Sequence, residues 1–170
     1  MHTIRMYPDP VLRERAKNVP GWDPLIPALV KTMAEVMYDR KGVGLAAPQV
    51  GVSLRVIVAD VGEGLVSLVN PEIVEEESEE VMEEGCLSVP GAHVDVKRTR
   101  AIVVKALDTE GKDLTLKADN LLARVIQHEI DHLDGVLIID KLEGEERLRF
   151  DLEYSKGAAT IEPPPAAKIL

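Results

Sequence analysis

The chain has 170 residues, of which 45% are hydrophobic, a size and composition that favour one globular domain with its own core. Its formal net charge of -10 disfavours nucleic acid and anionic lipid as partners, because no overall positive field is present to hold phosphates. The sequence contains no apolar run long enough to cross a bilayer and no secretory signal, and its single cysteine cannot form an internal disulfide, so we expect a cytoplasmic protein without a membrane partner.

The first predicted element is an amphipathic helix over residues 23–41. Apolar residues recur there every three or four positions, Pro24 suits the first turn, and Gly42 is expected to stop the helix. Short β-rich runs follow, separated by glycines and by the dipeptide Asn70-Pro71. They cover residues 55–60, 65–69, 73–76, 81–87, 101–108 and 113–117. These runs predict a mostly antiparallel or mixed sheet.

Seven glutamates fall within the ten residues 75–84. Like charges at this density repel one another and favour contact with water. We therefore predict a solvated turn or an exposed strand edge here, rather than a cation site.

The second predicted helix carries the most informative motif. It begins at Asp119, a suitable N-cap, and keeps a helical spacing of apolar residues until Gly135. Residues 136–139 are predicted as one more strand and residues 142–156 as a charged final helix. Three consecutive prolines favour a mobile tail at the end of the chain. The expected organisation is one domain over residues 1–157 and a tail over residues 158–170.

Residues 127–135 read Gln-His-Glu-Ile-Asp-His-Leu-Asp-Gly and contain the pattern H-E-x-x-H. His128 and His132 are one helical turn apart, so both imidazoles can point at one metal ion. Glu129 lies about 100° round the helix from His128, where it can reach a ligand of that ion without binding the ion itself. The motif predicts a metal site with a general base. The alternative, a chance pair of structural histidines, is disfavoured because the chain has only four histidines.

Two histidines need a third ligand, and its identity distinguishes the classes of metalloprotein. Metzincin peptidases place a histidine where this chain has Ile138, so the metzincin interpretation fails. A thermolysin-like zincin peptidase would take a glutamate from a later helix. The candidates are Glu143, Glu145, Glu146 and Glu153, and their spacing singles out none of them.

Cys86 is the other candidate for the third ligand. A thiolate with two imidazoles forms a tetrahedral site with one open position, which is typical of catalytic metal centres. Two alternatives stay open: a buried core cysteine, and a nucleophile that a nearby base would have to activate. Neither His2 nor His93 has a spacing that would supply a fourth ligand and close the site.

A glycine-containing loop joins the first helix to a strand. Residues 42–51 read Gly-Val-Gly-Leu-Ala-Ala-Pro-Gln-Val-Gly. Gly42 and Gly44 let the backbone approach another chain closely, and Gln49 provides an uncharged amide donor. The loop lacks the residues of a phosphate-binding motif. Beside a metal site, the Gln49 amide is suited to stabilising a developing oxyanion.

Three separated stretches, residues 42–49, 84–88 and 127–135, together resemble the three signature motifs of the peptide deformylase family, in the family's order. The resemblance extends from Arg5 to Phe150. It implies an α+β fold in which mixed or antiparallel sheets pack around a central motif helix, with further helices near each end of the chain. It also implies a metal-dependent hydrolase that removes the formyl group from the N-terminal formyl-methionine of newly synthesised proteins and releases formate.

The resemblance also implies roles for individual residues. Three of them would hold the metal: Cys86, His128 and His132. Glu129 would act as the general acid and base, taking a proton from a metal-activated water and giving it to the leaving amine. Gln49 and the backbone N–H of Leu87 would stabilise the negative charge on the formyl oxygen.

Further matching positions would bind substrate or support the site. The backbone of Gly44 would pair with the substrate. Three residues resemble the pocket for the methionine side chain: Val43, Leu121 and Val125. Glu84 and Arg98 match a pair that supports the metal site from behind. His93 stands where many relatives have a residue that faces the substrate, and its role is left open.

The resemblance favours Fe(II) as the working ion, and Zn(II), Ni(II) and Co(II) also suit a thiolate with two imidazoles. The expected partners are N-formylmethionyl nascent peptides and, transiently, the ribosome. Some relatives dock on the ribosome through a basic C-terminal helix, whereas residues 143–156 here hold five acidic and three basic residues. That composition disfavours docking by this helix.

Two rival functions differ from this interpretation in what they would require of the chain. A zincin-type metallopeptidase would cleave peptide bonds within a chain instead of releasing formate. A non-catalytic, metal-stabilised binding module would need the metal ligands but not Gln49 and Glu129 beside them.

Overall fold

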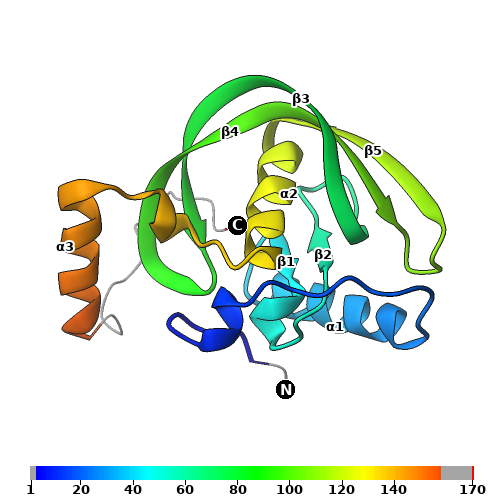
Figure 1. Cartoon of the computed structure of the whole chain (residues 1–170), viewed down its shortest axis with the longest axis horizontal. Coiled ribbons are helices and arrows are strands. Elements are labelled where there is room, and N and C mark those ends of the chain that lie inside the picture. Colours follow the sequence, from blue (N-terminus) through cyan, green and yellow to red (C-terminus); the bar gives the residue numbers. More distant parts are fainter. Residues whose placement is uncertain (1–2, 158–169) are drawn as a thin grey trace.

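A helix, α2 (Asn120–Leu133), lies at the centre of the fold, and an antiparallel sheet curves around it (Figure 1). The computed structural model describes residues 3–157 and 170. Within that part of the chain the sheet has five strands in the order β1-β2-β3-β4-β5, and each neighbouring pair is antiparallel. The strands are β1 (Gly44–Ala46), β2 (Val56–Ala59), β3 (Val66–Cys86), β4 (Val89–Leu107) and β5 (Asp113–Asp119). The predicted α+β class and the central motif helix are confirmed.

β3 and β4 form a long hairpin that arches over α2 (Figure 1). The three runs predicted at residues 65–69, 73–76 and 81–87 are one continuous strand, so the prediction of separate strands is wrong. Asn70-Pro71 makes no turn. The strand continues through this dipeptide, and its pairing with β4 shifts register between Val69 and Glu72. β4 also starts well before the predicted run at residues 101–108, and its buried and exposed residues largely alternate from Val89 onward.

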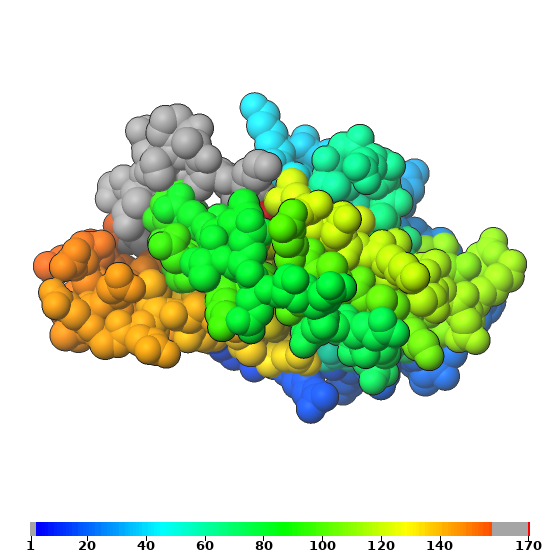
Figure 2. All heavy atoms as spheres, turned by 90° about the horizontal axis from the view of Figure 1, so that it is seen from above, coloured from blue at the N-terminus to red at the C-terminus, as the bar shows by residue number. Residues whose placement is uncertain are grey.

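The glutamate-rich block lies on the outer surface of this hairpin. Residues 74–83 of β3 are exposed, as the charge density predicts. They are nevertheless part of a strand whose backbone pairs with β4, and not a turn. Seen from above, β3 and β4 make up much of the surface between the C-terminal helix at one end and β5 at the other (Figure 2).

Two further helices pack on the two ends of the molecule. α1 (Leu25–Asp39) begins just after Pro24, and its apolar stripe packs against β1 and β2. α3 (Gly144–Ser155) has no buried residue and lies beside the tip of the β3–β4 hairpin (Figure 1). Asp119 occupies the N-cap position of α2, but its side chain makes no capping hydrogen bond. No helix in the described part of the chain has the length and apolar character needed to cross a bilayer.

Three short 3-10 helices complete the described elements: η1 (Pro10–Arg13), η2 (Ala47–Val50) and η3 (Ile138–Lys141). The strand predicted over residues 136–139 is wrong, because this segment turns into η3. The side chain of Asp140 accepts a hydrogen bond from the Leu137 N–H at 2.9 Å and so stabilises the turn. Ile138 and Ile139 are buried against the β3–β4 hairpin, which explains their apolar character without a strand.

The tail expected to be mobile falls partly outside the described residues. Residues 158–169 are not described. Leu170 is described, and it is buried.

Candidate metal centre

Two elements that lie far apart in the sequence bring three ligand side chains together. α2 presents His128 and His132 on one face, and Cys86 lies at the end of β3, facing them. One ligand atom from each residue lies within 4.8 Å of the other two, and the Cys86 Sγ is 3.3 Å from the His132 Nε2. All three side chains are buried. The helical spacing of the histidines and the end of a long hairpin thus produce a compact set of one sulfur and two nitrogen ligands.

Glu84 anchors this cluster through His128. One of its oxygens, Oε2, lies 3.0 Å from the His128 Nδ1. Its carboxylate accepts two hydrogen bonds from Arg98, at 2.9 and 3.0 Å, and one from Arg124 at 2.8 Å. Arg98 also donates to Asp131 on α2. Two carboxylates and two guanidinium groups balance one another, so the buried charges are compensated.

The hydrogen bonds to Glu84 keep its carboxylate ionised. Burial alone would raise its pKa, but the hydrogen bonds from His128 and Arg98 outweigh burial and lower the pKa of Glu84 to about 2. An ionised Glu84 holds the Nδ1 proton of His128, which leaves the His128 Nε2 with a lone pair that points away from Glu84. This Nε2 has no hydrogen-bond partner among the residues described.

The chemistry of the three donors fits a divalent cation. Burial comes first, followed by the electrostatic effects of the neighbouring His128 and of the Arg98 guanidinium, and together they lower the pKa of His132 well below its usual value. The His132 imidazole is therefore neutral and can bind a metal. Burial raises the pKa of the Cys86 thiol to about 12, so without a cation the thiol stays protonated. A thiol in this state is a poor nucleophile, and a bound divalent ion would hold it as the thiolate. The arrangement therefore favours a ligand over a nucleophile.

Glu129 lies beside the three ligands but has no partner of its own. Its side chain is fully buried, and neither carboxylate oxygen has a hydrogen-bond partner among the residues described. Burial, together with the negative charge of Glu84, raises the pKa of Glu129 well above its usual value. A buried carboxylate without a partner is costly for stability, which is typical of a group retained for chemistry.

The glycine-containing loop, residues 42–51, brings the amide of Gln49 to the ligand cluster. The Gln49 Oε1 accepts a hydrogen bond from the Ala46 N–H at 2.9 Å, which fixes the orientation of its amide. The Gln49 Nε2 then donates to the Ser88 Oγ at 3.1 Å and lies 4.0 Å from the Cys86 Sγ. The N–H groups of Gln49 are therefore held beside the metal ligands. Leu87 follows Cys86 directly and packs close to Gly42 in the same loop.

The three residues expected to form a side-chain pocket lie together. Val125 is buried on α2, and Val43 and Leu121 pack around it with Ala59 of β2. The predicted site residues therefore all lie around α2, and none of them lies in another part of the fold.

Gly44 leaves just enough room for Glu129. A Cβ atom at Gly44 would lie 2.5 Å from the Glu129 Oε1 and 2.5 Å from the Val125 Cγ1. We expect Gly44→Ala to displace the Glu129 carboxylate and to lower the rate of the deformylation that the sequence resemblance implies by about a hundredfold. A loss of this size is typical when a reacting group is misplaced by about 1 Å. Steady-state kinetics measure this loss. Gly21→Ala is the matched control, because no atom lies within 4 Å of the added Cβ there. Equal activity in both variants would contradict this role of Gly44.

Comparison with known proteins decides which family this site belongs to. The family model described as polypeptide deformylase matches residues 1–148. The chain belongs to the peptide deformylase family. The peptide deformylase of Halothermothrix orenii is 53% identical over 141 residues, which cover 82% of this chain and 92% of the relative. A second peptide deformylase, from a Thermotoga species, is 50% identical over 163 residues, covering 95% of this chain and 99% of the relative.

Solved peptide deformylases share the fold as well. The structure from Legionella pneumophila has a TM-score of 0.85 and 43% identity, and the match covers 96% of this chain and 99% of that one. The structure from Thermotoga maritima has a TM-score of 0.81 and 49% identity, covering 85% and 99%. Another, from Synechococcus elongatus, was solved in complex with actinonin; it has a TM-score of 0.83 and 40% identity, with 95% of this chain and 89% of that chain covered.

As a peptide deformylase, the chain is a metal-dependent hydrolase that removes the formyl group from the N-terminal formyl-methionine of new proteins and releases formate. The zincin alternative loses its structural basis, because the described ligand cluster takes its third member from β3 and includes no glutamate of α3 or of the turn before it. Ile138, which stands at the metzincin ligand position, is buried in an apolar cluster.

Sequence reasoning missed two polar residues that support this deformylase site. Arg124 is buried and donates to Glu84, to the Val96 carbonyl at 2.9 Å and to the Glu80 carbonyl at 2.8 Å. Ser88 is buried and accepts the hydrogen bond from Gln49. A signal for Arg124 was present, because it lies four residues before His128, on the same face of a helix whose other inward residues are mostly apolar.

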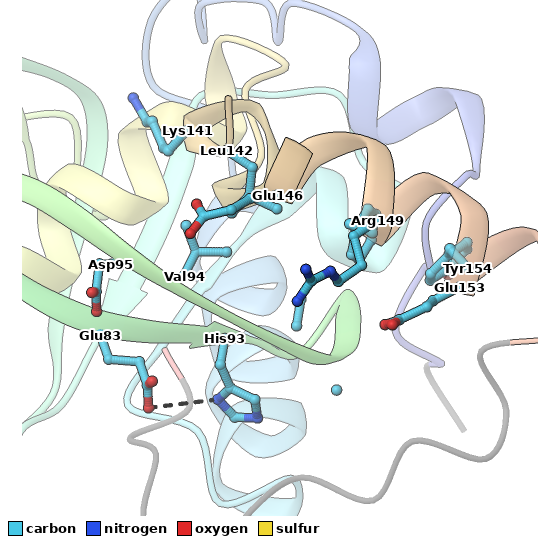
Figure 3. Close-up of a pocket in the computed structure, with 13 residues that line it drawn as sticks. Glu83, His93, Val94, Asp95, Lys141, Leu142, Glu146, Arg149, Glu153 and Tyr154 are labelled. Carbon is cyan, nitrogen blue, oxygen red and sulfur yellow. Dashed lines mark ion pairs between the residues drawn. The ribbon is translucent and has the colours of Figure 1, made fainter. Parts of the chain in front are cut away.

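His93 lies in a different hollow from the metal ligands. His93 contributes to the lining of a pocket between the β3–β4 hairpin and α3. Figure 3 shows its ring directed at Glu83, with the Nδ1 3.9 Å from the Glu83 carboxylate. From α3, Glu146, Arg149 and Tyr154 line the same pocket. His93 is not a member of the ligand cluster.

Proposed function

We propose that Cys86, His128 and His132 bind the catalytic metal of this deformylase and that Glu129 is its general acid and base. The observation that supports this most directly is a set of three buried ligand atoms within 4.8 Å of one another, beside a buried carboxylate that has no partner among the residues described. A structural metal site would close with a fourth protein ligand and would not need that carboxylate.

The proposed mechanism uses the groups around the cluster in sequence. When bound, the ion supplies a Lewis acid at which water loses a proton near neutral pH. Glu129 takes that proton as the water oxygen adds to the formyl carbon. Gln49 and the Leu87 N–H donate hydrogen bonds to the formyl oxygen as it gains negative charge. Glu129 then gives the proton to the leaving nitrogen while the C–N bond breaks. One water is consumed, and formate and a free amine are released.

Substrate position follows from the walls of the site. We propose that the methionine side chain enters the pocket of Val43, Leu121 and Val125, all of which are aliphatic. The peptide backbone would run along Gly44, where a side chain would collide with Glu129. Glu84 and Arg98 act from behind the metal ligands by fixing the ring of His128.

The substrate, N-formylmethionyl peptide, gives the test of this function. We expect formyl-Met-Ala-Ser to release one equivalent of formate and intact Met-Ala-Ser, with the rate falling to background in a chelator and returning when a divalent ion is added back. A formate assay and chromatography of the peptide measure both products. Cleavage of the Met-Ala or Ala-Ser bond would instead indicate a peptidase, and a rate unaffected by chelator would contradict the metal mechanism.

We propose Fe(II) as the working ion, on the basis of the family resemblance and of a ligand set that also suits Zn(II), Ni(II) and Co(II). Metal analysis after anaerobic purification tests this, and zinc alone in a fully active preparation would contradict it.

We also propose a cytoplasmic enzyme that meets nascent chains at the ribosome without using α3 for docking. The acidic balance of residues 143–156 supports that exclusion. Cosedimentation with ribosomes at several salt concentrations tests this proposal. If the protein associated with ribosomes in a salt-sensitive way, and if substitution of the charged residues of α3 abolished that association, the proposal would be contradicted.

A further inference from the structure

Leu170, the last residue of the sequence, is buried beside α2, where Figure 1 marks the C-terminus. Its side chain is 1% exposed and belongs to an apolar cluster with Ala59 and Val125. The partly buried members of this cluster are Val43, Val61, Leu121 and Leu122. Transfer of a leucine side chain from water to an apolar environment lowers the free energy, and this cluster provides such an environment.

The apolar cluster that contains Leu170 coincides with the proposed methionine pocket. Val43, Leu121 and Val125, the residues assigned to that pocket, all belong to the cluster that surrounds Leu170. Leucine and methionine have similar volumes and replace each other in apolar sites at low cost. The side chain of Leu170 therefore lies where the first side chain of a substrate would lie.

The backbone of Leu170 is also bound next to the metal ligands. Its N–H donates a hydrogen bond to the Gly85 carbonyl at 3.3 Å. Gly85 directly precedes Cys86 and falls within the register shift between Glu84 and Cys86, so it has no Cα partner in the β3–β4 ladder. A carbonyl at such an irregularity is available to an extended peptide, and main-chain hydrogen bonds of this kind hold peptides on strands. Leu170 thus combines a pocket contact with a main-chain contact, as a bound peptide would.

We propose that Leu170 is an internal ligand of the substrate pocket, which formyl-methionyl peptides must displace before they can react. This regulation rests on the function proposed above, because it requires that Val43, Leu121 and Val125 bind the substrate side chain. Since Leu170 belongs to the same chain, its competition does not depend on enzyme concentration. The apparent affinity for substrate is reduced in proportion to the fraction of open pockets, while the chemical step in the bound complex is unaffected.

Two substitutions at Leu170 separate occupancy of the pocket from other effects. Aspartate cannot be buried among aliphatic side chains, whereas methionine fills the same space as leucine. If the pocket is occupied about four-fifths of the time, Leu170→Asp lowers KM for formyl-Met-Ala-Ser about fivefold and leaves kcat unchanged. Leu170→Met keeps the wild-type KM. A wild-type KM in Leu170→Asp, or the same change in both variants, would overturn the proposal.

A second readout is independent of turnover. In the full-length, zinc-loaded protein with 13C-labelled leucine and valine methyl groups, we expect nuclear Overhauser contacts between Leu170 and Val125, which saturating Met-Ala-Ser abolishes. Absence of these contacts in the free protein, or their persistence in the saturated one, would overturn the proposal. Absence of formate release while the contacts are present would instead count against the proposed function and leave the burial of Leu170 intact.

Discussion

Replacing Glu129 by glutamine should abolish deformylation while leaving the metal in place. Glutamine keeps the size of the side chain but can neither take the proton from water nor return it to the leaving nitrogen. Because the proposed mechanism gives this one group the roles of both acid and base, we expect kcat to fall at least about a thousandfold. Glu129 is not one of the three ligands, so elemental analysis should still find one metal ion per chain.

Stability provides an internal check on the Glu129 variant. The wild-type carboxylate is fully buried and has no partner among the described residues, so removing its charge should not lower the free energy of unfolding. Urea unfolding measures this directly. The control is Glu110→Gln, at a side chain that is 67% exposed in the turn between β4 and β5, and that variant should keep full activity. Turnover by Glu129→Gln at a rate close to wild type would assign the base to another group.

Replacing Cys86 by alanine should release the metal. The two imidazoles that remain are too few to hold a divalent ion in competition with a mild chelator. Loss of only an outer hydrogen-bond partner of a ligand typically weakens metal binding by about 10- to 100-fold, so we expect loss of a ligand itself to exceed about a hundredfold. Activity should fall in parallel with metal content.

The Cys86 experiment also distinguishes the earlier alternatives for this residue. A buried core cysteine predicts a full equivalent of metal in the alanine variant, with only a modest effect on stability. A nucleophile predicts retained metal with no activity. The Glu129→Gln protein, purified in the same way, is the matched control for metal retention. One equivalent of metal in Cys86→Ala would remove this residue from the ligand set.

The parts of the fold that sequence predicts best are those with a local periodic signal. α1 and α2 follow from apolar residues at helical spacing, and the pair His128 and His132 is defined by that same spacing. The position of Cys86 opposite this pair depends on a hairpin that pairs Cys86 with Val89 and on packing between β4 and α2. Such contacts between distant residues produce no periodic pattern in the sequence, so Cys86 is predicted as the third ligand only from its chemistry and from the family resemblance.

The failures have equally specific causes. The sequence predicts separate strands in place of β3 because Asn70-Pro71 and a dense glutamate run resemble turns, whereas pairing with β4 continues the strand through both. The sequence predicts a strand in place of η3 because Ile138 and Ile139 are apolar and a run this short has no period that distinguishes a strand from a helical turn. The sequence alone does not predict the ion pair of Arg124, because its partner Glu84 lies 40 residues earlier in the chain.

The four hydrogen bonds of Glu84 also have a consequence for how the molecule opens. This one carboxylate, on β3, joins Arg98 of β4 to Arg124 and His128 of α2. Lifting the β3–β4 arch from α2 would leave a buried carboxylate and two guanidinium groups unpaired at the same moment, so partial opening is unfavourable. The arch and the motif helix should therefore open as one cooperative unit, and the amide hydrogens of both should exchange with the same free energy of opening. Cys86 should separate from His128 and His132 only when this unit opens.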